Sequence, residues 1–445
     1  MISAEPNAEN ESLARNTPQP KCEAERLAAM DAVRGFAVLG ILAMNIVSIG
    51  LPGAARLNPM LAGGFEGVNR LLWWIGYLLF DEKMIALFSM LFGAGLVVQA
   101  DRALQTGRSP AGLFYRRAAV LLLIGLAHAY LVWDGDILVT YAMCGMLAYP
   151  FRVLSPRLLI PLGVAVMLVA IPFGFLIGGV LETARDIADR VAELERKGEQ
   201  ASQADLSAAA DWAEIRRSFN PSSEELAANL AQARQEGYIA HVRRMAPETL
   251  AVQTQLFVAA FLWLVGGRML IGMGLMKAGV FSGSLSPRFY LALAVVGYGA
   301  GLPLVYLCGA ALIAREFDPV AIFGGLLLCN SFAGMLVALG HIGLVVLVTK
   351  AGCLPALTER LAAVGRMALT NYLVQSLVCT SLFCGWGFAL IGRLDRAALC
   401  ALMLGIWLAQ LAYSPLWLAR FRFGPAEWLW RSLTLGRWQS LRGSP

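Results

Sequence analysis

Charged residues are scarce in this chain. Only 15% of its 445 residues are Asp, Glu, Lys or Arg, whereas a soluble domain averages about 25%. Hydrophobic residues make up 58%, and the mean hydropathy is +0.63. The apolar residues fall in long blocks, and a membrane-spanning helix needs about 20 of them. The sequence therefore predicts a polytopic membrane protein.

The chain also lacks the short motifs of several enzyme classes. It contains no G-x-x-x-x-G-K-[ST], G-x-S-x-G or H-E-x-x-H pattern, which argues against the ATPases, serine hydrolases and zinc proteases that these motifs define. Its eight cysteines form no C-x-x-C pair, and most lie in apolar stretches, where cysteine behaves as a small hydrophobe. We expect no disulfide and no metal site.

The expected fold class is all-α, a polytopic membrane helical bundle of about ten spans. The ten apolar stretches are 32–52, 84–100, 118–134, 137–151, 158–180, 251–275, 289–313, 320–349, 365–391 and 397–418. The chain divides into a polar N-terminal tail (1–29), a first membrane half (30–180), a charged helical loop (181–250), a second membrane half (251–420) and a C-terminal tail (421–445). The N-terminal tail has no cleavage site, so the first span is predicted to be an uncleaved anchor.

Lysine and arginine are distributed unevenly over the short loops. If the N-terminus is inside, 21 of the 36 lie on the inner side and six on the outer side. The positive-inside rule then predicts two cytoplasmic termini and an extracytoplasmic 181–250 loop. The net charge of +6 follows from this asymmetry and suggests anionic lipid headgroups, not nucleic acid, as partners. The expected location is the bacterial cytoplasmic (inner) membrane.

His128 lies inside an apolar stretch and is one of only three histidines. An ionisable side chain at membrane depth is costly unless it is paired or hydrated. Asp134 and Asp136 follow within about two helical turns, and Asp136 precedes the next span, where it could be the N-cap. A neutral imidazole suits general-base chemistry near neutral pH. His128 is therefore either a base oriented by Asp136 or Asp134, or a structural histidine bonded to a carbonyl.

Polar residues also lie along single faces of two predicted helices, beginning at the predicted cytoplasmic side. Asp31 and Arg34 are three residues apart and can pair. Asn45 lies on the same face, about 16 Å deeper, and Arg117 shares a face with His128 at the same spacing of eleven residues. These residues form either structural pairs or a cytoplasmic mouth for an anionic substrate.

The second half carries further polar candidates. Arg268 interrupts an apolar run, which is typical of a guanidinium that faces a cavity or an anion, or that extends to the headgroups. Arg366 begins the ninth span, and Asn371 and Gln375 follow on one face, either for substrate or for interhelical hydrogen bonds. His241 lies in the charged loop, where we expect it to be solvated.

Several stretches together resemble the YeiB-like family of polytopic bacterial membrane proteins, whose C-terminal half is a domain of unknown function. They are DAVRGFAVLGILAMNI (31–46), KMIALFSMLFGAGL (83–96), GLAHAYLVWDGDILVTYA (125–142), GRMALTNYLVQS (365–376) and FGPAEWLWRSLT (423–434). The resemblance covers both halves of the chain.

The D-x-x-R-G opening at residues 31–35 is also distantly similar to transmembrane acyltransferases such as heparan-α-glucosaminide N-acetyltransferase. This resemblance implies transfer of an acyl group from cytoplasmic acyl-CoA, with a histidine soon after the first span. This sequence has no histidine in residues 52–84, so His128 becomes the candidate for that role.

The leading hypothesis is a membrane acyltransferase. Arg34, Arg117 and Arg268 would bind the phosphates of acyl-CoA at the inner mouth, and His128 would deprotonate an extracytoplasmic or lipid-borne acceptor. The alternative is a transporter of a small anionic or amphipathic metabolite. The expected partners are membrane lipids and a small-molecule, sugar or lipid acceptor. The sequence does not decide whether the chain forms a homodimer.

Overall fold

The computed structural model describes residues 20–107 and 109–442, and within these every regular element is a helix. Phe421 and Arg442 form one isolated β-bridge. The prediction of an all-α helical bundle is confirmed. Of the predicted N-terminal tail, residues 1–19 lie outside the described residues, whereas Pro20 already begins the first helix, α2.

Among the described residues, eight helical stretches are long and apolar enough to cross a membrane. They are α2 (Pro20–Gly50), α4 with α5 (Gly67–Leu79, Lys83–Gln105), α6 (Pro110–Leu131), α8 with α9 (Pro156–Leu168, Ala170–Lys197), α12 with η2 and α13 (Tyr238–Ala251, Val252–Phe261, Leu262–Lys277), α14 (Pro287–Ala314), α15 with η3 and α16 (Pro319–Ala321, Ile322–Leu326, Leu327–Ala351), and α19 (Arg396–Leu418).

The other two predicted spans are shorter helices. The fourth is α7 (Leu138–Ala148) with the 3₁₀ helix η1 (Tyr149–Val153), and the ninth is α18 (Ala368–Phe383). Eleven residues of α-helix extend only about 16 Å, about half of a typical hydrocarbon core. The turn before α7 is bonded through Asp136 to His128, one helical turn before the end of α6.

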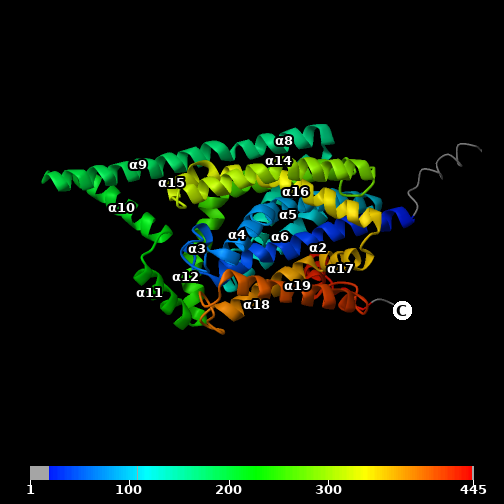
Figure 1. Cartoon of the computed structure of the whole chain (residues 1–445). Coiled ribbons are helices and arrows are strands. Elements are labelled where there is room, and N and C mark those ends of the chain that lie inside the picture. Colours follow the sequence, from blue (N-terminus) through cyan, green and yellow to red (C-terminus); the bar gives the residue numbers. More distant parts are fainter. Residues whose placement is uncertain (1–19, 108, 443–445) are drawn as a thin grey trace, which may run out of the picture.

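The long helices lie side by side, and the start of α2 (blue) and the last described segment of the chain (red) lie at the same end of the bundle (Figure 1). We call this the terminal end. At the opposite end α10 (Gln203–Phe219) and α11 (Ser223–Gln235) extend from the bundle (Figure 1), and we call it the insertion end. Both helices lie within residues 181–250, the stretch predicted to be a charged helical loop. Its helix α11 begins at a capping box, in which Ser222 and Glu225 bond to each other's backbone amides.

Glycines allow several helix backbones to approach closely. A Cβ atom at Gly93 of α5 would lie 2.0 Å from the Met269 carbonyl oxygen of α13, and one at Gly272 would lie 2.0 Å from the Met90 carbonyl oxygen. Close approach at small residues is a main source of helix association in lipid. This contact fixes α5 against α13, the two helices that carry the buried charges described below.

Three short helices complete the bundle. They are α3 (Ala54–Leu57), α17 (Pro355–Arg366) and α20 (Pro425–Leu435). At the terminal end, the carboxylate of Glu427 on α20 accepts hydrogen bonds from the backbone amides of Leu369 and Thr370 at the start of α18. The indole of Trp430 donates to the Arg117 carbonyl oxygen at 2.9 Å. These bonds fix α20 across the ends of α6 and α18.

Candidate functional site

A cavity of about 310 Å³ lies in the half of the bundle nearer the insertion end. Its walls come from the last turns of α2, the α4–α5 break, the turn after α6, the π-helix η2, and parts of α16, α18 and α19. Four carboxylates line it: Asp81, Glu82, Asp134 and Asp136. Of the binding residues predicted from the sequence, only Asn45 is among the lining residues.

His128 and Asp136 form a buried pair beside this cavity. The Nδ1 atom of His128 lies 2.8 Å from Oδ1 of Asp136, and the two side chains are 2% and 1% exposed. The other carboxylate oxygen accepts a hydrogen bond from the Val139 amide at 2.9 Å in the first turn of α7, although the N-cap residue of this helix is Ile137 and not Asp136. Among the described residues His128 Nε2 has no hydrogen-bond partner. A carboxylate on Nδ1–H leaves the lone pair on Nε2, which is the form that a general base requires.

The sequence left open whether Asp134 or Asp136 orients the imidazole. In the structure Asp136 orients the ring, because of these two carboxylates only Asp136 contacts His128. Asp134 instead lines the cavity, near the charged side chains of Arg244 and Glu248 on α12.

Tyr372 of α18 was missed by sequence reasoning. Its ring centroid lies 5.2 Å from that of His128, and it lines the cavity. The side chain is buried, with 5% of the residue exposed, and its hydroxyl has no hydrogen-bond partner in the described part of the chain. No sequence signal indicated it, because a tyrosine in an apolar helix is usually a packing residue.

Arg268 lies in a different place from the one predicted. Its side chain is 1% exposed, and its Nη2 atom lies 3.5 Å from Oε2 of Glu82 and donates to the Ser331 carbonyl oxygen at 3.0 Å. The Ser331 hydroxyl donates to the same Glu82 oxygen at 2.7 Å. The placement of Arg268 at the inner mouth is therefore wrong: it balances the carboxylate of Glu82 inside the bundle.

The break between α4 and α5 carries this acidic group together with a buried lysine. Glu82 has φ 62°, a left-handed conformation that costs free energy for a residue other than glycine. Lys83 is fully buried, and its Nζ atom donates to the Tyr77 carbonyl oxygen and to Oδ1 of Asn330, each at 2.7 Å. Ionic and hydrogen bonds of Glu82 and Lys83 thus stabilise the break. Neither residue was among the functional residues predicted from the sequence.

The remaining predicted arginines meet at the terminal end. Arg34 Nη1 lies 2.6 Å from Oδ1 of Asp31, as the three-residue spacing predicted. Arg366 is near enough to act electrostatically on Asp31, and Arg34 and Arg431 act in the same way on Arg117. Two carboxylates lie in the same group, because Asp31 pairs with Arg34 and Glu427 is near enough to act electrostatically on Arg431.

Arg117 is held by an aromatic side chain. Its guanidinium carbon lies 4.1 Å from the ring centroid of Trp430, a cation–π contact. The Nε atom of Arg117 is buried and has no hydrogen-bond partner in residues 20–107 and 109–442.

Asn371 and Gln375 lie away from the cavity, in interhelical hydrogen bonds. The Asn371 amide donates to the Val364 carbonyl oxygen at 3.1 Å. The Gln375 amide donates to the Val38 carbonyl oxygen at 3.2 Å and to Oε1 of Gln410 at 2.8 Å. Of the two roles that the sequence left open, the structure shows interhelical bonding.

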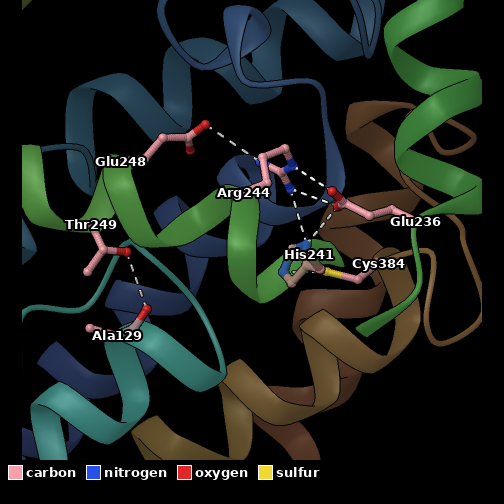
Figure 2. A network of polar contacts seen from close by, with 7 residues as sticks. All are labelled: Ala129, Glu236, His241, Arg244, Glu248, Thr249 and Cys384. Atoms are coloured by element: carbon pink, nitrogen blue, oxygen red, sulfur yellow. Dashed lines mark hydrogen bonds and ion pairs between the residues drawn. The ribbon is translucent and has the colours of Figure 1, made fainter. Parts of the chain in front are cut away.

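His241 is buried, so the prediction of a solvated side chain is wrong. Figure 2 shows its ring between Glu236 and Cys384. The Nδ1 atom of His241 lies 3.0 Å from a Glu236 oxygen, and the Nε2 atom of His241 lies 3.8 Å from Sγ of Cys384. Arg244 donates two hydrogen bonds to the same Glu236 carboxylate, at 2.9 and 3.0 Å. The start of α12 therefore folds back onto the loop after α18.

No group of three or more His, Cys, Asp or Glu side chains within residues 20–107 and 109–442 is placed to hold a metal ion. The residues that line the cavity include carboxylates, hydroxyl groups and the guanidinium groups of Arg56 and Arg396, and the imidazole of His128 lies next to two lining residues, Asp136 and Tyr372.

The chain matches one protein family and resembles individual bacterial proteins along nearly its whole length. Residues 275–437 match a family described as protein of unknown function (DUF418). The uncharacterized protein YeiB of Escherichia coli (strain K12) is 32% identical over 428 residues, which cover 92% of this chain and 97% of that protein. The uncharacterized protein YxaH of Bacillus subtilis (strain 168) is 28% identical over 436 residues, 95% of this chain and 98% of that protein. No solved structure matches the chain.

Proposed function

Because the chain belongs to the YeiB-like family of membrane proteins, whose relatives are described without an activity, we propose its function from its own side chains. We propose a membrane acyltransferase that moves an acyl group from cytoplasmic acyl-CoA to an extracytoplasmic or lipid-borne acceptor, in the bacterial inner membrane. The observation that carries this proposal is the buried His128–Asp136 pair, with an unbonded Nε2, beside a cavity.

The reaction would proceed as follows. An acceptor hydroxyl or amine attacks the thioester carbonyl carbon, and His128 Nε2 takes the proton that the acceptor loses. The carbon–sulfur bond then breaks, and the CoA sulfur receives the proton from the imidazolium. Asp136 keeps the ring oriented and stabilises its positive charge during transfer. Burial strengthens each of these electrostatic contacts relative to water.

The arrangement along α6 supports acyl-CoA as donor. Arg117 precedes His128 by eleven residues of helix, a rise of about 16 Å. The phosphates of CoA are separated from its thioester by the long pantetheine arm, so a donor bound by both regions must reach over a comparable distance. Arg34, Arg117 and Arg366 would hold the phosphates at the terminal end, where guanidinium groups suit phosphate geometry.

The test measures CoA thiol release by purified protein in proteoliposomes supplied with acyl-CoA and bacterial lipid extract. The variant His128→Gln should lower the rate about 10²–10⁴-fold, because an amide cannot accept a proton near pH 7. The matched control is His341→Gln. His341 is equally buried, but its ring nitrogens both bond, to the Tyr298 hydroxyl at 2.8 Å and the Leu79 carbonyl oxygen at 2.9 Å.

The control should keep the turnover number of its folded fraction, even where its thermal stability falls. Equal turnover in folded His128→Gln and wild-type protein would refute His128 as the base and with it the proposed mechanism.

Transport of a small anionic or amphipathic metabolite is the second candidate function. The observation in its favour is the α4–α5 break, where Asp81 and Glu82 line the cavity, because transporters often bind substrate at interrupted helices. In the same proteoliposomes, a transporter would move a solute unchanged without releasing CoA thiol. Its flux would also be insensitive to His128→Gln.

A further inference from the structure

We propose that Tyr372 is a further catalytic residue, whose hydroxyl donates a hydrogen bond to the acyl carbonyl oxygen as that oxygen gains negative charge. The inference rests on the proposed function and names a group that completes its site.

The evidence begins with unpartnered hydroxyl groups. Three tyrosines, Tyr77, Tyr149 and Tyr372, are buried and have hydroxyls without a hydrogen-bond partner in the described part of the chain. A buried polar group without a partner is unfavourable, so such groups are rare and call for a reason. Tyr77 and Tyr372 line the cavity, whereas Tyr149 does not. A ligand in the cavity is therefore a natural partner for the first two.

Position separates Tyr372 from Tyr77. The Tyr372 ring lies 5.2 Å from the imidazole of His128, centroid to centroid. Both side chains present an unbonded polar atom, Nε2 on one and the hydroxyl on the other. The two groups do not bond to each other, so a reacting group placed between them could contact both. A base and an oxyanion donor that act on one reacting centre have to lie as near to each other as these two rings do.

The neighbours of Tyr372 favour donation by its hydroxyl. The backbone of Ile137 lies near the phenol oxygen, but the hydroxyl has no hydrogen-bond partner among the described residues. Its proton is therefore free to point toward a ligand in the cavity. The group is thus placed to donate a hydrogen bond to a ligand.

The chemical step balances with Tyr372 in this role. The acceptor heteroatom forms a bond to the carbonyl carbon and loses its proton to His128 Nε2. The carbonyl π electrons move to oxygen, which receives the Tyr372 hydrogen bond while the phenol keeps its proton. Return of that electron pair breaks the carbon–sulfur bond, and the CoA sulfur takes the proton from His128. No further reactant is needed.

The test is Tyr372→Phe, assayed by CoA thiol release over a range of acyl-CoA concentrations. Loss of one oxyanion donor typically lowers kcat about 10²–10³-fold. The KM for acyl-CoA should change little, because the bond forms mainly in the transition state. Thermal unfolding in detergent should be unchanged or slightly later than in the wild type, since the variant removes a hydroxyl that has no protein partner.

The matched control is Tyr149→Phe. Its hydroxyl is equally buried and unpartnered, but its ring stacks on Phe114 at 4.2 Å, away from the cavity. Neither its kcat nor its thermal midpoint should fall.

Two results would overturn the inference. One is wild-type kcat in Tyr372→Phe. The other is a loss of kcat that comes with a clear fall in thermal midpoint, because the hydroxyl would then have a structural partner. A failure of the proposed function is distinguishable: it appears as absent CoA release in the wild type, or as full activity in His128→Gln. If the wild type is active and His128→Gln is impaired, full activity in Tyr372→Phe refutes the role of Tyr372 alone.

Discussion

Replacing Arg268 by methionine should be among the most destabilising single changes in this protein. The substitution removes the 3.5 Å contact with Glu82 and the 3.0 Å hydrogen bond to the Ser331 carbonyl oxygen. Of its partners in the described part of the chain, the carboxylate of Glu82 then keeps only the Ser331 hydroxyl. Removing one member of a buried ion pair costs about 3–5 kcal/mol. Because the Glu82 side chain is 18% exposed and the contact is long, we expect the lower end, about 3 kcal/mol.

The double variant Arg268→Met/Glu82→Gln tests the cause of this loss. A neutral amide at position 82 can still accept the Ser331 hydrogen bond but carries no charge to compensate. The double variant should therefore be more stable than Arg268→Met alone, with a coupling free energy of about 1–3 kcal/mol. The assay is thermal unfolding in detergent followed by tryptophan fluorescence.

Arg315→Met is the control for loss of an arginine. Arg315 is exposed at the insertion end, so the change should stay within about 0.5 kcal/mol of the wild type. If Arg268→Met is as stable as this control, or if adding Glu82→Gln gives only the sum of the two single effects, then the Arg268–Glu82 pair does not stabilise the bundle.

Two further predictions concern packing and orientation. Gly93→Ala should lower the thermal midpoint, because the new methyl group would lie 2.0 Å from the Met269 carbonyl oxygen and overpacking costs about 1–3 kcal/mol or more; Gly266→Ala on α13, with no atom within 4 Å, should not. A cysteine introduced at Ser222 in a background without other reactive cysteines should be labelled by an impermeant maleimide in intact spheroplasts, whereas labelling only after lysis would contradict a cytoplasmic location of the termini.

Properties that depend on composition and local spacing could be predicted from the sequence. Scarce charge and long apolar blocks identified the helical membrane bundle, and the three-residue spacing of Asp31 and Arg34 predicted their ion pair. The pairing of His128 with Asp136 could also be predicted from the sequence, because only one short turn separates the two residues. An ionisable side chain in lipid is costly without a partner, so a nearby carboxylate was expected to pair with the histidine.

Contacts between distant segments could not be predicted in this way. Arg268 appeared to lack a counter-ion because Glu82 is 186 residues away in the chain. The spacing of Asn371 and Gln375 showed that they share a helix face but not that α2 and α19 supply their partners. Helical periodicity gives the direction of a side chain within its own helix, whereas its partner depends on how the helices pack.

The error at His241 leads to a prediction about pH. Glu236, in the turn between α11 and α12, bonds to Arg244 and His241 of α12 (Figure 2), and the His241 ring contacts Cys384 after α18. Partial burial by itself would raise the pKa of Glu236, but the hydrogen bonds from Arg244 and His241 outweigh it and lower this pKa below the ordinary value of 4.5. The other groups that face the cluster are Glu248, Asp134 and Cys384.

A carboxylate with a lowered pKa in the folded state stabilises that state above its ordinary pKa, and this stabilisation is lost as the pH falls through the folded-state value. Amide hydrogen exchange in residues 233–244, corrected for intrinsic rates, should therefore accelerate below about pH 4.5. Glu236→Gln should show the faster exchange already at pH 7 and lose this pH dependence. The control is Glu225→Gln in α11, whose carboxylate also has a lowered pKa, from its bonds to Ser222, but is fully exposed and does not contact the bundle. If Glu236→Gln exchanges like Glu225→Gln at both pH values, the polar network at His241 does not hold the insertion against the loop after α18, and apolar contacts must do so.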